Sequence, residues 1–418
     1  MKNKTVIVVG GGLSGLTAAV YLADAGIDVT LLEQGKSYAS RREENGLEVL
    51  VGLGGAGTIS GGKLCFPPAS GAIWRKTRES LIKFRPFCQN VLSGLHAILP
   101  FPQQEINCAS DAIARKDYHT ELILKDSMRA FVSELICKTI QKGVTVRCGC
   151  RVENLCRTTA DYEVLFHNEA GERERLNGQY VVLATGRTSV PFLQSVLRPK
   201  HVHQPDMGIR LTTNTKQPAF SVIGEDVKLK QIVGQFLVRT FCVCSGGDAV
   251  RTSTYGYTCF DGHFKEQLTD RTNLGILARS PIHSEPEAVG RYLRAMQCHV
   301  DAEISLKDFI KYRDLLAKGS GYESLFEALT VFISELYRSN MLTQNADEIP
   351  VMLPAVDRIN PLIGTNTDFE SQLPHIYVTG DASGISRGFV QAMWAGYCTA
   401  EGIIGQITHI QRNQEAVS

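Results

Sequence analysis

Residues Thr5 to Glu33, TVIVVGGGLSGLTAAVYLADAGIDVTLLE, decide the fold of this chain. Residues 5–10 are rich in β-branched apolar side chains, which predicts a short buried strand of a parallel sheet. Beyond the glycines, apolar residues recur at the spacing of one helix face, at Leu16, Ala19, Val20 and Ala23. Gly26 is suited to end that helix. IDVTLLE then predicts a second buried strand, so the whole stretch predicts a β-α-β unit.

The glycines Gly10, Gly12 and Gly15 have the spacing G-x-G-x-x-G between the first strand and the helix. The first permits a tight turn, the second lets a pyrophosphate approach the backbone, and the third lets the helix pack closely on the sheet. The N–H groups at the helix start then face the phosphates. Glu33, which ends the second strand, can accept hydrogen bonds from both hydroxyls of an adenosine ribose. In this context the motif predicts a dinucleotide site.

Length and composition are those of a globular protein. A chain of 418 residues suggests roughly two or three domains, and 43% apolar with 21% charged residues suffices for a large core. The formal net charge is +1 and no long basic run is present, so nucleic acid is not expected as a partner. The mixed charge run at residues 41–44 is expected to be a solvated surface.

The 12 cysteines form no C-x-x-C pair and no framework of a secreted domain. Cys148/Cys150 and Cys242/Cys244 are C-x-C pairs, a spacing shorter than zinc sites use, so no metal is predicted. Reduced thiols in a cytoplasmic protein fit this usage. The apolar run within residues 1–23 is explained by the strand and helix rather than by a signal peptide. No other long apolar stretch predicts a membrane span.

A second glycine-rich segment, VLVGLGGAGTISGGKLC at residues 49–65, follows a polar loop. Its glycines alternate with apolar residues rather than with serine or charged residues. A flexible loop is one explanation of such a composition. Backbone that lies directly against a ligand is the better explanation, because glycine allows the closest approach.

Three further segments complete the first half of the chain. Residues 126–142 predict a helix that Asp126 or Ser127 caps. The polar segment 168–178 predicts a hairpin-like connection. QYVVLATGRTSV, residues 179–190, predicts a buried strand that ends in the letters ATG.

The second half changes character. Residues 200–282 are β-rich, and helices are predicted at 285–297 and 322–339. HIYVTGDASG then predicts another buried strand, and residues 389–404 a last helix that Gly405 caps. The sequence therefore predicts an α/β fold in which a Rossmann-like dinucleotide-binding domain, residues 1–199 and 346–418, carries an inserted α+β substrate domain, residues 200–345.

Three motifs together carry a family resemblance: VGGGLSG with Glu33, LATG at 183–186, and YVTGDASG at 377–384. The pattern resembles two-domain FAD-dependent oxidoreductases of the glutathione-reductase-like superfamily. LGGAGTISGGKL, RTFCVCSGGDAV and SRGFVQA are similar to segments of a group of poorly characterised bacterial FAD-dependent dehydrogenases. Gly61 stands where that group has an acidic residue before GKL, so no role of that acid carries over.

The resemblance implies FAD as cofactor. Its contacts would come from Gly10, Gly12, Leu13, Ser14, Gly15, Glu33, Gln34, Val152, Ala184, Thr185, Gly186, Gly380, Asp381, Gly388, Phe389 and Val390, with Gly55, Ala56, Gly57 and Thr58 from the second glycine-rich segment. Val152 would meet the adenine through its backbone, and Asp381 would bond the ribityl chain or the pyrophosphate. The N–H groups at 388–391 would face the flavin N1/C2 edge, where reduced flavin is negative. Arg387 would add a positive charge there or form a surface salt bridge.

The resemblance has limits that narrow the function. Only one dinucleotide fingerprint and no C-x-x-x-x-C disulfide motif is present, so a pyridine-nucleotide disulfide reductase is not predicted. Electrons would come from the substrate, from transiently bound NAD(P)H or from an electron-carrier protein. A small-molecule substrate would enter at a domain interface.

Candidate catalytic residues are Arg387, Tyr255, Cys242 and Cys244. Cys242 and Cys244 would share one side of a strand and line either the flavin or the core. Tyr255, on the next strand, would be a proton donor or a packing residue. The favoured function is a flavin dehydrogenase or reductase that moves a hydride between FAD N5 and a small organic substrate. An FAD monooxygenase and an RNA-modifying or binding flavoprotein are the alternatives, and the absence of a basic patch disfavours the last.

Overall fold

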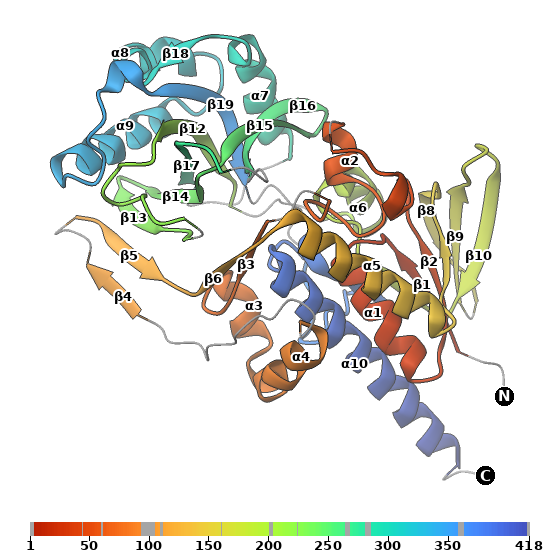
Figure 1. The fold of residues 1–418 in the computed structure, drawn as a ribbon. Helices are drawn as coiled ribbons and strands as arrows, with labels where there is room; N and C mark the ends of the chain where they lie inside the picture. Colours follow the sequence, from red (N-terminus) through yellow and green to blue (C-terminus); the bar gives the residue numbers. More distant parts are fainter. Residues whose placement is uncertain are drawn as a thin grey trace. The chain divides into compact units, whose positions relative to one another are not determined.

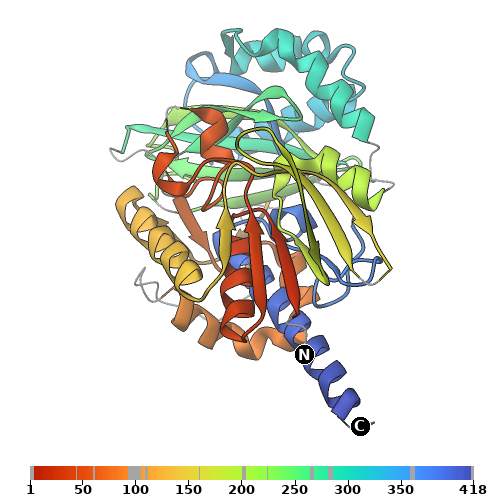
Figure 2. The same ribbon diagram turned by 90° about the vertical axis from the view of Figure 1, so that its right-hand side faces the viewer.

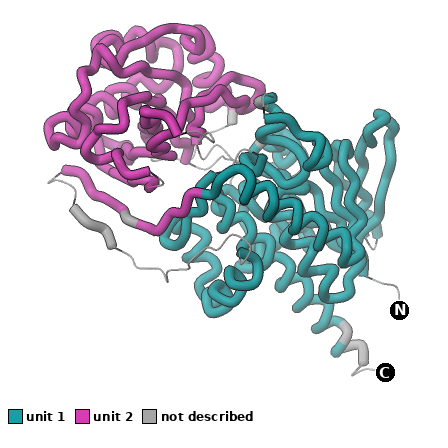
Figure 3. Tube along the Cα trace, in the orientation of Figure 1, with its two compact units in different colours: residues 1–99, 123–199, 360–418 teal, residues 100–122, 200–359 magenta. Residues whose placement is uncertain are grey.

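The computed structural model describes residues 4–43, 45–59, 62–92, 105–108, 112–159, 161–199, 204–223, 225–263, 268–280, 286–357 and 363–415. The chain forms two compact units (Figure 3). Unit 1 contains residues 1–99, 123–199 and 360–418, and unit 2 contains residues 100–122 and 200–359. Residues 100–122 and 346–359, which the sequence suggests belong to the cofactor domain, lie in unit 2 because they supply strands to its sheet.

Unit 1 is built on a five-stranded parallel sheet in the order β20-β11-β1-β2-β7. The strands are β1 (Thr5–Val9), β2 (Asp28–Leu32), β7 (Thr145–Arg147), β11 (Tyr180–Leu183) and β20 (Ile376–Val378). β1 lies at the centre, where its near-continuous apolar run is buried on both faces. This sheet, with helix α1 (Leu13–Asp24) between β1 and β2, confirms the predicted Rossmann-like α/β fold.

Both faces of the parallel sheet are covered (Figures 1 and 2). Val6 and Val8 pack with α1, α5 (Lys125–Gln141) and α10 (Phe389–Glu415). Ile7 and Val9 point the other way, because successive side chains of a strand alternate, and pack with an antiparallel three-stranded sheet. That sheet consists of β8 (Arg151–Arg157), β9 (Tyr162–His167) and β10 (Arg173–Gly178), with α6 (Val190–Leu197) beside it.

Several shorter elements complete unit 1: η1 (Tyr38–Ser40), α2 (Gly46–Leu50), β3 (Gly62–Cys65), α3 (Gly71–Lys76), η2 (Arg78–Lys83), α4 (Phe84–Val91), η4 (Arg187–Ser189) and η7 (Gly380–Ser383), where η marks a short 3-10 helix. β6 (Thr120–Ile123) carries the chain from unit 2 back into unit 1.

Three local predictions in unit 1 are wrong. Helix α5 starts at Lys125 without a side-chain cap from Asp126 or Ser127. Segment 168–178 is not only a connection, since its second half is β10, which pairs with β9 over six residues. Helix α10 continues past Gly405, because Ile407 beyond it is buried against the core and holds the helix in place.

Unit 2 contains an eight-stranded sheet in the order β18-β19-β12-β17-β14-β13-β5-β4. Its strands are β4 (Glu105–Cys108), β5 (Ala114–Asp117), β12 (Asp206–Asn214), β13 (Lys228–Val233), β14 (Phe236–Ser245), β17 (Arg271–Arg279), β18 (Ile304–Ser305) and β19 (Pro350–Asp357). β15 (Asp248–Thr254) and β16 (Tyr257–His263) form a separate hairpin.

The two faces of the unit 2 sheet differ in chemistry. Met207 and Ile209 of β12 pack in a hydrophobic cluster with the helices α7 (Pro286–Met296), α8 (Leu306–Ala317) and α9 (Glu323–Arg338). Asp206 and Arg210 alternate with them and therefore lie on the opposite face, where charged side chains are buried. The 3-10 helices η5 (Gln297–His299) and η6 (Ala346–Glu348) complete the described part of unit 2. Within the described ranges, no helix is both long and apolar enough to cross a membrane.

Candidate functional site

The carboxyl edge of the parallel sheet of unit 1 brings together four of the predicted segments. β1, β2, β11 and β20 run in the same direction, so the residues that follow them meet at one edge. These residues are Gly10–Gly15 after β1, Glu33 and Gln34 after β2, Ala184–Gly186 after β11, and Gly380 and Asp381 after β20. Ligands of open parallel sheets bind at this edge.

The three motif glycines differ in what surrounds them. Gly10 has φ +105°, and an added Cβ would lie 2.4 Å from the carbonyl oxygen of Ala184. A Cβ on Gly15 would lie 2.0 Å from the carbonyl oxygen of Gly10, so this glycine lets α1 pack on the turn. Gly12 has an ordinary extended backbone, and its added Cβ would meet protein only at 3.6 Å, at the Cα of Gly55. The space beside Gly12 is therefore open to a ligand.

The start of α1 carries no charge-neutralising group of its own. No side chain caps it, and no acidic residue lies in its first turn. Leu13 and Ser14 are buried, and the first N–H groups of a helix have no acceptor within the helix. The Ser14 hydroxyl is 3.0 Å from that of Thr379, which ties α1 to the end of β20. An uncapped helix terminus of this kind suits a phosphate group.

Glu33 braces the glycine turn. Its side chain is 5% exposed, and its two oxygens accept the N–H groups of Gly11 and Gly35, each at 2.7 Å. A carboxylate oxygen has capacity for a second hydrogen bond, so contact with a ribose hydroxyl remains compatible with these bonds. The adjacent Gln34 is exposed.

The second glycine-rich segment lies directly on the first. The Gly54 N–H donates to the Gly11 carbonyl at 2.8 Å, and Gly12 and Gly54 form a parallel bridge. An added Cβ on Gly55 would lie 2.8 Å from the Cα of Gly12. Gly55 is thus required for backbone-to-backbone packing. Contact of Gly55, Ala56, Gly57 and Thr58 with the cofactor stays a prediction; Ala56 is exposed, whereas Thr58 is buried and donates to the Gly55 carbonyl at 2.9 Å.

Arg41 holds this second segment and was missed by the sequence analysis. The prediction of a solvated surface at 41–44 is wrong for Arg41, whose side chain is 5% exposed. Its guanidinium donates to the carbonyls of Glu48 at 2.7 and 2.9 Å, Leu53 at 2.8 Å and Gly55 at 3.0 Å. No sequence signal marks such a residue, because its partners are backbone carbonyls.

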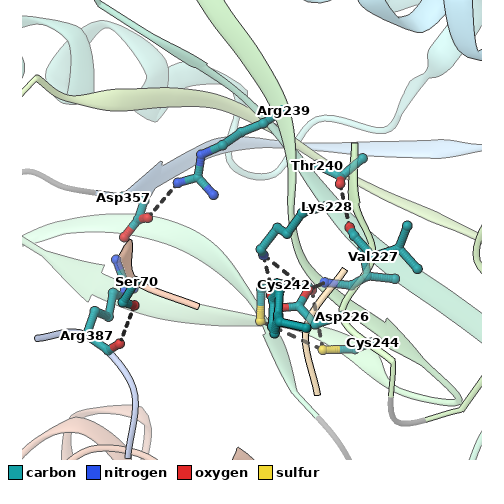
Figure 4. A network of polar contacts seen from close by, with 12 residues as sticks. Ser70, Asp226, Val227, Lys228, Arg239, Thr240, Cys242, Cys244, Asp357 and Arg387 are labelled. Atoms are coloured by element: carbon teal, nitrogen blue, oxygen red, sulfur yellow. Dashed lines mark hydrogen bonds and ion pairs between the residues drawn. The ribbon is translucent and has the colours of Figure 1, made fainter. Parts of the chain in front are cut away.

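The start of α10 is tied to the segment after β3. The Ser70 hydroxyl donates to the carbonyl of Arg387 at 2.9 Å (Figure 4), and the Gln391 amide donates to the carbonyl of Cys65 at 2.6 Å. The Phe389 ring lies where a Cβ on Gly62 would be 2.7 Å from it. Val390 is fully buried in the hydrophobic cluster of unit 1.

The other predicted contacts are distributed along the same unit. Gly388 is exposed with φ +114°, as a turn before a helix requires. Asp381 is partly exposed, and burial raises the pKa of its carboxyl while Arg187 opposes the shift. Among described residues, the buried hydroxyl of Thr185 has no hydrogen-bond partner. Val152 lies on β8 and packs against the cluster beneath the sheet.

The remaining catalytic candidates lie in unit 2. Tyr255 is not on a strand as predicted; it forms the β15–β16 turn with φ +52°, because Gly256 follows it and completes a two-residue hairpin loop. It packs against the hydrophobic cluster of unit 2, and burial raises the pKa of its hydroxyl, so its placement favours packing. Cys242 and Cys244 lie at a bulge of β14, with their sulfurs 3.9 Å apart (Figure 4).

A buried ion network occupies the polar face of the unit 2 sheet. Arg239 pairs with Asp206, which is fully buried. Arg239 also pairs with Asp357 at 2.8 Å (Figure 4). Arg279 pairs with Asp206 at 2.7 Å. Although burial opposes ionisation, the two arginines hold the pKa of Asp206 below its ordinary value.

Residues 5–90 match the family model described as FAD dependent oxidoreductase. This segment is therefore similar to the FAD-dependent oxidoreductases of that family. It holds the glycine turn, Glu33, Arg41 and the second glycine-rich segment, so the match falls on the part of the site that the geometry singles out. The cofactor is FAD.

Individual relatives match less of their own length. A carotenoid 3,4-desaturase of Haloarcula japonica is 49% identical over 55 residues, 12% of this chain and 11% of the desaturase. The flavin-dependent halogenase CmlS is 12% identical over 99% of this chain and 60% of its own, with a TM-score of 0.46. A geranylgeranyl bacteriochlorophyll reductase-like protein of Thermoplasma acidophilum is 13% identical over 100% of this chain and 84% of its own, with a TM-score of 0.46. This chain thus spans less than two thirds of the desaturase and of the halogenase.

The residues present fit FAD. The open space at Gly12 and the uncapped start of α1 suit the pyrophosphate. The unpartnered hydroxyl of Thr185 sits at the same sheet edge, where a ligand can satisfy it. The narrower assignment to the glutathione-reductase-like superfamily remains an expectation from the motifs.

Proposed function

We propose that this chain is an FAD-dependent dehydrogenase or reductase that moves a hydride between the flavin and a small organic substrate. The observation that carries the proposal is the braced glycine turn at the carboxyl edge of the sheet, where Glu33, Arg41 and the second glycine-rich segment prepare a rigid cofactor cradle. A rigid cradle lowers the ordering cost of binding. FAD, when bound, supplies reversible hydride acceptance.

The protein's own contribution would be to hold FAD and to orient it. Gly12 and the start of α1 would hold the pyrophosphate, and Glu33 the adenosine ribose. The N–H groups that begin α10 would favour negative charge at the flavin, and Arg387 would add to that effect. Because Ser70 and Gln391 bond the segments around this helix start, they support its position within unit 1.

Unit 2 is proposed to supply the substrate-binding groups. Its sheet has one apolar face against helices and one face with charged residues such as Arg239 and Asp206. Buried charges of this kind are costly unless paired or functional. The substrate would be a small polar molecule. Electrons would come from the substrate itself when it is oxidised, or from NAD(P)H or an electron-carrier protein in the cytoplasm when the substrate is reduced.

The alternative proposal is an FAD-dependent monooxygenase, since the cofactor cradle suits either reaction. An RNA-modifying or binding flavoprotein is less favoured, because the net charge of +1 offers no electrostatic attraction for nucleic acid.

Anaerobic mixing of the purified FAD-loaded protein with candidate metabolites, NADH and NADPH tests the proposal. A dehydrogenase is expected to lose its flavin absorbance on addition of the substrate without oxygen, and to form hydrogen peroxide but no hydroxylated product when oxygen is admitted. A hydroxylated organic product formed with oxygen consumption would support the monooxygenase instead. Purified protein without FAD, and unable to take it up, would contradict both.

A further inference from the structure

Cys242 and Cys244 form a close thiol pair at a bulge in β14. The register of β14 against β17 shifts between Phe241 and Cys244. At this bulge Cys242 has φ +45°, a conformation that residues other than glycine rarely adopt. The result is a distance of 3.9 Å between the two sulfurs (Figure 4). Such a distance is that of two touching thiols, and a modest rotation of side chains would bring them to bonding distance.

Buried polar side chains hold the bulge from both sides. Arg210 is fully buried and donates to the carbonyl of Cys242 at 2.7 Å. Asn273 orients this guanidinium by accepting from it at 2.5 and 2.8 Å. The carboxylate of Asp226 accepts the N–H of Val243 at 2.9 Å. The peptide group that joins Cys242 to Val243 is thus held at its carbonyl and at its N–H by specific partners, so the unusual backbone is supported by its surroundings.

The two sulfurs differ in access. Cys242 is partly exposed, whereas Cys244 is 1% exposed. A dithiol exchange site has this asymmetry: one accessible thiol attacks the incoming disulfide, and a second, buried thiol resolves the mixed disulfide.

The other C-x-C pair shows that the spacing alone does not create this arrangement. The Cys150 thiol contacts the backbone carbonyl of Cys148 at 3.6 Å, and the Cys244 thiol makes the same contact with the Cys242 carbonyl at 3.4 Å. What distinguishes the second pair is the contact between its sulfurs at 3.9 Å. Burial, together with Glu33, raises the pKa of Cys148 to about 11, so its thiolate is scarce at neutral pH. Cys148 and Cys150 therefore serve as an internal control.

We propose that Cys242 and Cys244 are a redox-active dithiol that exchanges with the disulfide of a low-molecular-weight thiol. The Cys242 thiolate attacks one sulfur of the incoming disulfide and releases the first thiolate, which leaves a mixed disulfide on Cys242. The Cys244 thiolate then attacks the Cys242 sulfur and releases the second thiolate. In total the two cysteine thiols are oxidised to one disulfide, and one disulfide is reduced to two thiols, so atoms and electrons balance.

The proposal does not depend on the flavin, because all the residues that carry it lie in unit 2. The pair would give the protein a second two-electron couple, which interconverts with the cellular thiol pool.

Peptide mapping of the full-length FAD-loaded protein tests the proposal. The protein is equilibrated anaerobically with glutathione disulfide and reduced glutathione at graded ratios, quenched by alkylation and digested. In oxidising buffer the peptide that contains Cys242 and Cys244 is expected to lose both alkylation sites together and to be lighter by two hydrogen atoms. Full alkylation of both cysteines at every ratio would overturn the proposal, as would a disulfide from Cys242 to any other cysteine.

Two variants resolve the order of the steps. Cys244→Ser should accumulate a stable glutathione adduct on Cys242, because the resolving thiol is lost. Cys242→Ser should lose both the adduct and the disulfide. Cys148→Ser should leave the mapping result unchanged. An adduct that forms on Cys244 of the Cys242→Ser variant at the wild-type rate would contradict the assigned roles. If a variant does not fold, the mapping of the unaltered protein still tests whether the disulfide forms.

Discussion

Gly12 and Gly15 belong to one motif but have different roles in the structure. Gly15 lets α1 pack on the turn after β1, whereas Gly12 leaves space for the pyrophosphate, and an alanine variant at each position should distinguish the two roles. At Gly15 the added Cβ would lie 2.0 Å from the Gly10 carbonyl oxygen, far inside the contact distance of about 3.5 Å. The first turn of α1 would have to move away from the β1 turn. At Gly12 the nearest protein atom would be 3.6 Å away, and the backbone at φ −73° and ψ 177° suits alanine.

The magnitudes follow from these contacts. Forcing a methyl into a packed site costs about 1–3 kcal/mol or more, and the overlap at Gly15 places Gly15→Ala at the upper end. Alanine is better than glycine inside a helix by about 1 kcal/mol, which offsets part of the cost. Gly15→Ala should thus destabilise the apoprotein by about 2 kcal/mol. Gly12→Ala should leave its stability unchanged or raise it by about 0.4–1 kcal/mol, since it restricts the unfolded chain.

Gly12→Ala should lower the affinity for FAD even though it leaves the stability of the apoprotein unchanged or raises it. The added methyl occupies the approach of the pyrophosphate to the N–H groups of α1, and each charge-assisted hydrogen bond lost costs about 1.5–3 kcal/mol. Because about 1.4 kcal/mol is a tenfold change in Kd, affinity should fall by on the order of 10- to 100-fold for each such bond.

The assay can be confined to unit 1. Both tryptophans of the chain, Trp74 and Trp394, lie in its main hydrophobic cluster, so fluorescence during denaturant unfolding of the apoprotein reports this unit. FAD titration by flavin fluorescence gives the Kd. The reasoning is refuted if Gly12→Ala loses as much apoprotein stability as Gly15→Ala, or if it binds FAD as tightly as the unaltered chain.

Three further variants test other parts of the structure. Arg41→Met should lower the stability of unit 1 by about 2–4 kcal/mol, because buried carbonyls lose a charged donor. The control Arg42→Met, at an exposed neighbour, should change that stability by about 0.5 kcal/mol or less. Equal effects of the two variants would contradict the role of Arg41. Arg387→Ala should lower the flavin potential in a redox titration by about 30–60 mV, since about 1.4 kcal/mol corresponds to 30 mV for two electrons, and an unchanged potential would show that Arg387 does not act on the flavin. At a pH above the ordinary aspartate pKa of about 3.9, the charged form of Asp206 stabilises unit 2, and this contribution is lost as the pH falls through the lowered pKa of Asp206. In Asp206→Asn, the acid unfolding transition followed by circular dichroism should therefore be shallower. An acid transition identical to that of the unaltered protein would count against the network.

The cofactor half of the fold could be predicted from sequence because its signals are local. The turn at Gly10, the helix after it and the acid at Glu33 lie within one β-α-β unit, and each residue type has a mechanical reason at its position. The domain boundaries were less accessible. Segment 100–122 supplies strands to unit 2 only because β5 pairs with β13, more than one hundred residues later in the chain, and no local pattern encodes that pairing.

Glycine content alone does not say which surface approaches the backbone. An added Cβ on Gly55 would meet the backbone of Gly12, so this glycine is needed for close packing within the protein, and contact of the same segment with FAD stays a prediction. The absence of a side chain permits either approach. The approach is maintained by Arg41, whose carbonyl partners have no side-chain identity to recognise.

The two C-x-C pairs of this chain have the same sequence pattern but different local structures. Cys148/Cys150 and Cys242/Cys244 have the same spacing, and in both pairs the second thiol contacts the carbonyl of the first cysteine. Cys242 and Cys244 in addition have their sulfurs 3.9 Å apart. The difference arises at one residue, because Cys242 takes a positive φ that the regular strand would not impose. That conformation is supported by the fully buried guanidinium of Arg210, which reaches the Cys242 carbonyl from a strand 32 residues earlier. A pattern of three letters therefore cannot distinguish a reactive dithiol from two packed thiols. The distinction lies in the buried donor that holds the peptide between them.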